Sequence, residues 1–183
     1  MAKSIKISKK LVKNLLPTIV VGLAAAIMLI LAFTVYGATY RGDKFFGFVK
    51  LRDLIFGNGR VKTVVDDYVS YGNYGGGVSI FGLASFVLCC LSLVFALASF
   101  IKKGKILSVI SSVTLMLSGI SMCFLLKAGG KVFIENAILG NGWQYFTDFF
   151  QGMGLSVGVY IYALLGIWAG VCSLALILFP LKK

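Results

Sequence analysis

The sequence is poor in the residues that carry most enzyme chemistry. It contains no histidine and only six acidic residues, and none of these acids falls inside a long apolar run. Histidine is the commonest general base, and neither a histidine nor a Cys-x-x-Cys pair is present to bind zinc. We therefore predict that the chain is not an enzyme and that it uses no metal and no cofactor.

The polar segments between the apolar runs also lack cysteine. A thiol inside an apolar run behaves as a small hydrophobic group, and disulfide frameworks belong to exterior segments. We therefore expect no disulfide-stabilised exterior domain. The four cysteines, all within apolar runs, are Cys89, Cys90, Cys123 and Cys172.

What the sequence has in abundance is apolar surface. It is 59% hydrophobic and 13% charged, with a mean hydropathy of +0.96. Four apolar runs, 15–37, 78–101, 106–126 and 155–179, each reach the roughly 20 residues that cross a bilayer as a helix. We predict an all-α integral membrane protein, a single four-helix domain over 1–183 with loops 38–77 and 127–154. The net charge of +12 is scattered between these runs, so we expect no nucleic-acid binding.

The distribution of charge predicts how the chain crosses the membrane. The segment before the first run, the segment between the second and third, and the C-terminal end contain lysines and no acid, whereas all six acids lie in the other two loops. Lys and Arg are retained on the cytoplasmic side. We predict a multi-pass protein of the plasma membrane with both termini cytoplasmic and two outer loops. Many lysines without histidine favour a bacterial source.

Both outer loops contain a Gly-Asn-Gly sequence, and both halves enter their second span through Gly-x-Ser. Asn-Gly accepts positive φ at low cost, so each Gly-Asn-Gly predicts a tight turn. The repetition suggests that two helical hairpins arose by duplication; chance similarity in an apolar chain is the alternative. The sequences are Gly57-Asn58-Gly59 and Gly140-Asn141-Gly142, then Gly77-Val78-Ser79 and Gly154-Leu155-Ser156.

The first outer loop fits two local structures. The flanks 50–56 and 60–65 alternate and are β-branched enough for a β-hairpin. Alternatively, an interfacial helix would place Phe45, Phe48, Leu51, Leu54 and Ile55 on one face. Later in this loop, adjacent Asp66 and Asp67 would point opposite ways on an extended chain, so we expect no shared cation site there.

Two further groups of residues are candidates for contact with other proteins. Glycines spaced by multiples of four leave one face of the last span nearly bare, which suits close helix packing or a partner interface. Aromatic residues in the second loop suit an aromatic belt at the outer interface. The first group is Gly154, Gly158, Tyr162, Gly166 and Gly170; the second is Trp143, Tyr145 and Phe149, with Phe146 and Phe150 beside them.

Four spans with a longer first outer loop and a shorter second one resemble, in outline, the claudin-type tetraspan proteins of animals. The resemblance is one of topology. The Trp…Trp…Cys…Cys pattern of that family's first loop is absent, because neither residue type occurs between Thr39 and Gly77. We assign no family on this basis.

The leading functional hypothesis is a non-enzymatic membrane subunit or scaffold. It would contact other membrane subunits or copies of itself through the outer loops and the glycine-lined fourth helix, within the lipid bilayer. The alternative is a small oligomeric channel or exporter for an uncharged or weakly polar solute, with a pore lined by Ser and Tyr hydroxyls. An enzyme using Asp66, Asp67 or Asp148 at the outer surface ranks last.

Overall fold

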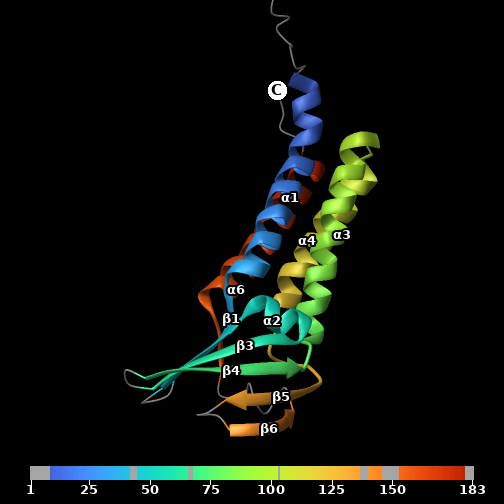
Figure 1. The fold of residues 1–183 in the computed structure, drawn as a ribbon. Helices are drawn as coiled ribbons and strands as arrows, with labels where there is room; N and C mark the ends of the chain where they lie inside the picture. Colours follow the sequence, from blue (N-terminus) through green and yellow to red (C-terminus); the bar gives the residue numbers. More distant parts are fainter. Residues whose placement is uncertain are drawn as a thin grey trace, which may run out of the picture.

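Four long apolar helices pack side by side in the computed structural model, and an antiparallel sheet lies at one end of them (Figure 1). The structure describes residues 9–41, 45–65, 68–102, 104–136, 140–145 and 153–179. Asp66, Asp67, Asp148, Phe149, Phe146 and Phe150, which entered the sequence-based hypotheses, lie outside these ranges.

The helices confirm the four predicted spans. Each is long and apolar enough to cross a bilayer, with mean hydropathy between 1.6 and 2.6 over its span. The first and third end earlier than predicted, because the chain turns into a strand at Tyr36 and into a turn at Cys123. The chain is a multi-pass membrane protein with four candidate spans. They are α1 (Lys9–Thr34), α3 (Ile80–Lys102), α4 (Lys105–Met122) and α6 (Val157–Leu178).

The distribution of side chains in the bundle is that of a protein surrounded by lipid. Large apolar side chains such as Leu23, Val94 and Trp168 point outward, whereas small ones such as Ala25 are buried between helices. In lipid, apolar surface gains nothing by being hidden, so close packing of small residues holds helices together. The helices follow one another around the bundle in the order α1, α3, α4, α6.

The sheet has seven antiparallel strands in the order β6-β5-β4-β3-β2-β1-β7, and both loops contribute to it. The first loop forms four adjacent strands, and the second loop adds two strands at one edge and a short one at the other. The sequence predicted no more than a hairpin here. The strands are β1 (Tyr36–Arg41), β2 (Phe45–Lys50), β3 (Asn58–Val65), β4 (Tyr68–Gly76), β5 (Lys131–Asn136), β6 (Gly140–Tyr145) and β7 (Gly154–Leu155).

The first loop follows neither of the two predicted structures completely. Residues 45–50 form β2, and the next six form a short helix, α2 (Leu51–Phe56), before β3 begins. The helix ends at Gly57, whose φ of 69° is left-handed and whose N–H donates to the carbonyl of Asp53 at 2.8 Å. Glycine adopts this conformation without strain, which stops the helix after two turns.

One of the two shared sequences occupies equivalent places in the two halves of the chain. Ser79 and Ser156 each stand immediately before the second span of their half, α3 and α6. The Gly-Asn-Gly sequences do not correspond: Gly57 ends α2, whereas Gly140-Asn141-Gly142 form the first half of β6. The duplication stays a hypothesis that rests on the serines.

The described start of α1, the end of α6 and the connection between α3 and α4 all lie at the end of the bundle opposite the sheet (Figure 1). Lys9, Lys102 and Lys105, which begin α1, end α3 and begin α4, therefore share one end of the bundle.

Candidate functional site

The glycine row of the last span lies inside the bundle. A Cβ added at Gly158 would come within 2.6 Å of the Val35 side chain, and one at Gly170 within 2.8 Å of the Ser112 carbonyl oxygen. Tyr162, in the same row, is fully buried. The row therefore brings α6 close to α1 and α4 of its own chain. Gly166 packs likewise against Gly119, whereas Gly154 lies in β7 with open space around it.

Several groups of hydroxyls lie between the helices at successive levels of the bundle, and we call them together the serine seam. Ser85 of α3 and Ser118 of α4 each donate to the other's carbonyl oxygen at 2.8 Å. Further along the same helix pair, Ser92 donates to the carbonyl of Ser111 at 2.7 Å. The seam consists of Thr18, Ser85, Ser92, Ser99, Ser108, Ser111, Ser112, Ser118 and Ser173, with Tyr162 beside its middle.

These hydroxyls hold helices together. Within the described residues, every buried side-chain nitrogen and oxygen has a hydrogen-bond partner. A hydroxyl that bonds another helix in lipid contributes packing rather than a path for solute. This seam was not predicted from the sequence, although Ser85, Ser92 and Ser99 recur every seven residues along one helix face.

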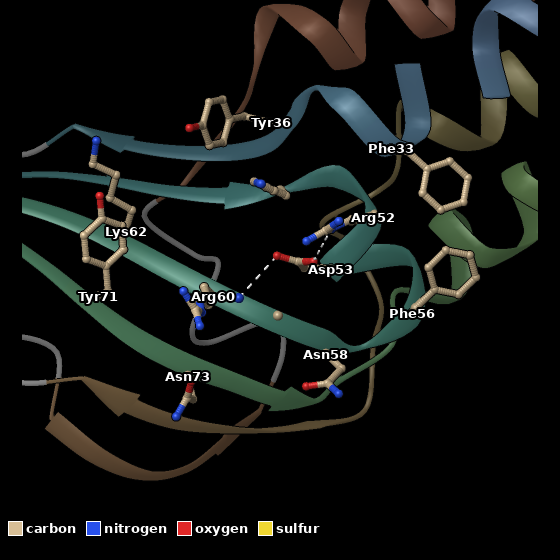
Figure 2. A pocket seen from close by; sticks show the side chains of 12 residues that line it. Phe33, Tyr36, Arg52, Asp53, Phe56, Asn58, Arg60, Lys62, Tyr71 and Asn73 are labelled. Carbon is tan, nitrogen blue, oxygen red and sulfur yellow. Dashed lines mark hydrogen bonds and ion pairs between the residues drawn. The ribbon is translucent and has the colours of Figure 1, made fainter. Parts of the chain in front are cut away.

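A pocket of about 750 Å³ opens where α2 meets the sheet (Figure 2). We call it the basic pocket, because four cationic side chains and a single carboxylate line it. Phenylalanines lie at one end and Lys62 with Tyr71 at the other (Figure 2). Its lining includes Lys50, Arg52, Arg60, Lys62 and Asp53, together with Phe33, Tyr36, Phe56, Asn58, Gly59, Tyr71 and Asn73.

Asp53 organises the middle of this pocket. Its side chain is 4% exposed, and one carboxylate oxygen accepts from Nε of Arg52 at 3.1 Å while the other accepts from the backbone N–H of Arg60 at 3.3 Å. A buried carboxylate needs such partners to offset its lost hydration. There is room for it because residue 59 is glycine: a Cβ at Gly59 would overlap the carboxyl group.

The two Gly-Asn-Gly sequences contribute to these structures in different ways. Gly57 caps α2, and Asn58 and Gly59 open β3 and line the basic pocket. Gly140, Asn141 and Gly142 are the first three residues of β6, with Gly140 paired with Asn136 of β5.

The described aromatic residues of the second loop lie on the sheet rather than at the end of a span. Trp143 and Tyr145 belong to β6, the strand farthest from the helices (Figure 1). Trp143 contacts Phe133 of β5 with ring centroids 5.3 Å apart, and the Lys131 ammonium lies 5.5 Å from the centre of the Tyr145 ring. We call Phe133, Trp143 and Tyr145 the aromatic edge.

The cations of the basic pocket were not singled out from the sequence. A signal was present, because Lys50 and Arg52, and then Arg60 and Lys62, occupy alternate positions on either side of Gly57. Alternate residues of a strand lie on one face, so Arg60 and Lys62 of β3 are brought together. The sequence does not reveal that α2 folds back to bring Asp53 against them.

Within the described ranges, no group of three or more His, Cys, Asp or Glu side chains could hold a metal ion. Comparison with protein-family models, with curated proteins and with solved structures finds no match for this chain.

Proposed function

We propose that this chain is a non-enzymatic membrane subunit or scaffold that binds a partner protein, or a second copy of itself, through the aromatic edge of its sheet. The glycine row, the other surface considered for this role, is filled by α1 and α4. The proposal therefore rests on the sheet.

The observation that carries the proposal is a group of aromatic side chains left exposed outside the bundle. Trp143 is 66% exposed, Tyr145 is 60% exposed and Phe133 is 37% exposed. Exposed apolar patches away from lipid mark interaction surfaces, and Trp and Tyr are the residues that dominate binding energy at interfaces. No described strand pairs with the free side of β6, which leaves backbone groups for a partner strand.

We further propose that the sheet faces the outside of the cell and that both termini are cytoplasmic. This orientation is supported by Lys9, Lys102 and Lys105, because the helix ends to which they belong lie opposite the sheet. A membrane-impermeant thiol reagent tests it: Tyr68→Cys should be labelled in intact cells. Both the labelled chain and its control, which keeps Tyr68, carry Cys123→Ser, because Cys123 follows α4 and is exposed whereas the other three cysteines lie in the spans.

The partner proposal is tested by measuring the mass of the complex after mild solubilisation. We expect the unmodified chain to run as an oligomer or with a stoichiometric partner, and a Trp143→Ala/Tyr145→Ala variant to run as a single copy. The matched control is Trp168→Ala, which removes the other tryptophan from a lipid-facing position of α6. A lone monomer for the unmodified chain, or equal behaviour of the two variants, would refute the proposal.

The channel or exporter alternative has less support. It needs hydroxyl groups that line a pore, and the seam hydroxyls bond instead to neighbouring helices. Solute flux through liposomes containing the purified chain, abolished by Gly158→Leu, would favour it over the scaffold.

A further inference from the structure

Among the described residues, the basic pocket holds more positive charge than its carboxylates neutralise. Its four described cations exceed its described carboxylates by three, because Asp53 is the one acidic residue in this lining. Asp53 pairs with Arg52, and in the part of the chain that is described Lys50, Arg60 and Lys62 form no ion pair. Cations gathered in a hollow with protein walls attract anions more strongly than the same charges on a flat surface. The pocket is therefore suited to an anionic ligand.

The register of the sheet places Lys50, Arg60 and Lys62 on the same face. Arg60 lies opposite Asn73, and Lys62 lies opposite Tyr71, so the four belong to the same face of β3 and β4. Lys50 joins this face from β2, since Phe48, two residues earlier, is the partner of Lys62. Cationic donors beside a phenol match the several acceptor oxygens of a phosphate group, while the Asn73 amide donates to the Glu135 carboxylate at 3.2 Å.

The other end of the pocket reaches the apolar part of the molecule. Phe33 lies in the last turn of α1, inside the candidate span Leu15–Thr34, and its ring stacks on Phe56 with centroids 6.0 Å apart. Both rings remain about half exposed. Figure 2 shows these rings at one end of the pocket and Lys62 with Tyr71 at the other. The pocket thus extends from the end of a membrane span to the polar face of the sheet.

We propose that the basic pocket binds the phosphate-bearing headgroup of an anionic lipid from the leaflet on the sheet side. Lys50, Arg60 and Lys62 contact the phosphate oxygens, while Phe33 and Phe56 contact the start of the acyl chains. Asp53 is a positioning residue that holds Arg52 toward the same space. A free phosphate ester shares the headgroup chemistry but would leave the aromatic end of the pocket unused, which favours the lipid.

The experiment titrates phosphatidylglycerol or phosphatidylcholine into the full chain in mild detergent and counts bound lipid by native mass spectrometry. We expect saturable binding of one phosphatidylglycerol and none of phosphatidylcholine. Replacing Arg60 and Lys62 by Gln should weaken this binding on the order of tenfold or more, since each basic residue near an anionic lipid contributes appreciably.

The matched control removes two charges elsewhere. Lys105 and Lys127 are exposed, and neither lines the pocket; replacing both by Gln should leave binding unchanged. An equal loss in this control would overturn the pocket as the site, because general electrostatic attraction would then explain the binding. Equal binding of the two lipids would overturn it as well.

Two further measurements keep the proposal falsifiable if the double variant folds poorly. Tyr71 is exposed, so Tyr71→Glu and Tyr71→Gln should both fold. The carboxylate that Tyr71→Glu places opposite Lys62 should weaken phosphatidylglycerol binding more than Tyr71→Gln does, and equal binding by the two variants would overturn the pocket as the site. Glycerol 3-phosphate and inorganic phosphate are added as competitors. Displacement of the lipid by either at comparable concentration would overturn the lipid as the source of the phosphate.

Discussion

The bundle and the sheet treat their polar side chains in opposite ways. In the bundle, most described hydroxyls of the serine seam bond to one another or to carbonyl groups of adjacent helices, and that of Ser111 bonds within its own helix. In the basic pocket, the described cations exceed the one carboxylate that they surround. Polar groups that find hydrogen-bond partners within the protein contribute to stability, whereas charged groups without a counter-ion can bind a ligand. The difference separates the part that maintains the fold from the part that offers binding sites.

The largest loss of stability is expected when a tight helix contact in the bundle is disrupted. A Cβ at Gly119 would come within 2.6 Å of the Ala163 carbonyl oxygen and 2.9 Å of the Ile167 nitrogen, both backbone atoms that cannot move independently of α6. We expect Gly119→Ala to lower the free energy of unfolding by up to about 3 kcal/mol, the upper range for overpacking. The measurement is SDS titration in mixed micelles.

Gly22→Ala is its matched control, because Gly22 also lies in a span and has nothing within 4 Å of the added methyl group. It should leave stability unchanged or raise it slightly, since alanine favours helix over glycine. Equal destabilisation by the two substitutions would show that close packing does not hold the bundle.

A smaller effect is expected from the Asp53 carboxylate, which joins α2 to β3. Asp53→Ala removes the acceptor for the Arg60 N–H and the partner of Arg52, and we expect a loss of about 1–2 kcal/mol from the unpaired groups. Arg52→Lys should cost less than about 1 kcal/mol, because it keeps a cation beside the buried carboxylate at a position where the side chain is half exposed. Thermal unfolding in detergent compares them, and the reverse order would contradict this role for Asp53.

The smallest effect is expected from a single hydroxyl of the seam. Ser85→Ala removes a bond between α3 and α4, and interhelical bonds of this kind contribute about 0.6 kcal/mol on average. Ser111→Ala is matched, because the Ser111 hydroxyl donates only to the Ser108 carbonyl in its own helix. We expect no loss for Ser111→Ala in the same SDS titration. A similar loss of stability in both variants would show that the effect comes from replacing serine within a helix rather than from losing the interhelical hydrogen bond.

The spans could be predicted from the sequence because a hydrocarbon environment demands about 20 apolar residues regardless of partners. The sheet could not, since its pairing joins distant segments: β4 pairs with β5, which lies more than fifty residues later. The local pattern at 45–65 was ambiguous, and Gly57 decided it by ending the helix between two strands.

The candidate sites also differ in whether they could be predicted from local sequence spacing alone. The glycine row was identified from its four-residue spacing, yet spacing does not tell whether a partner helix belongs to the same chain or to another. The basic pocket was missed because Lys50 and Arg60 come from different strands, and their meeting depends on register.

The links between sheet and helices are short. β1 begins two residues after α1 ends, Ser156 alone separates β7 from α6, and the backbone N–H of Ser156 donates to the Gly37 carbonyl. With so few connecting residues, the sheet and these two helices have little freedom to move separately. A displacement of the sheet should therefore tilt α1 and α6 together.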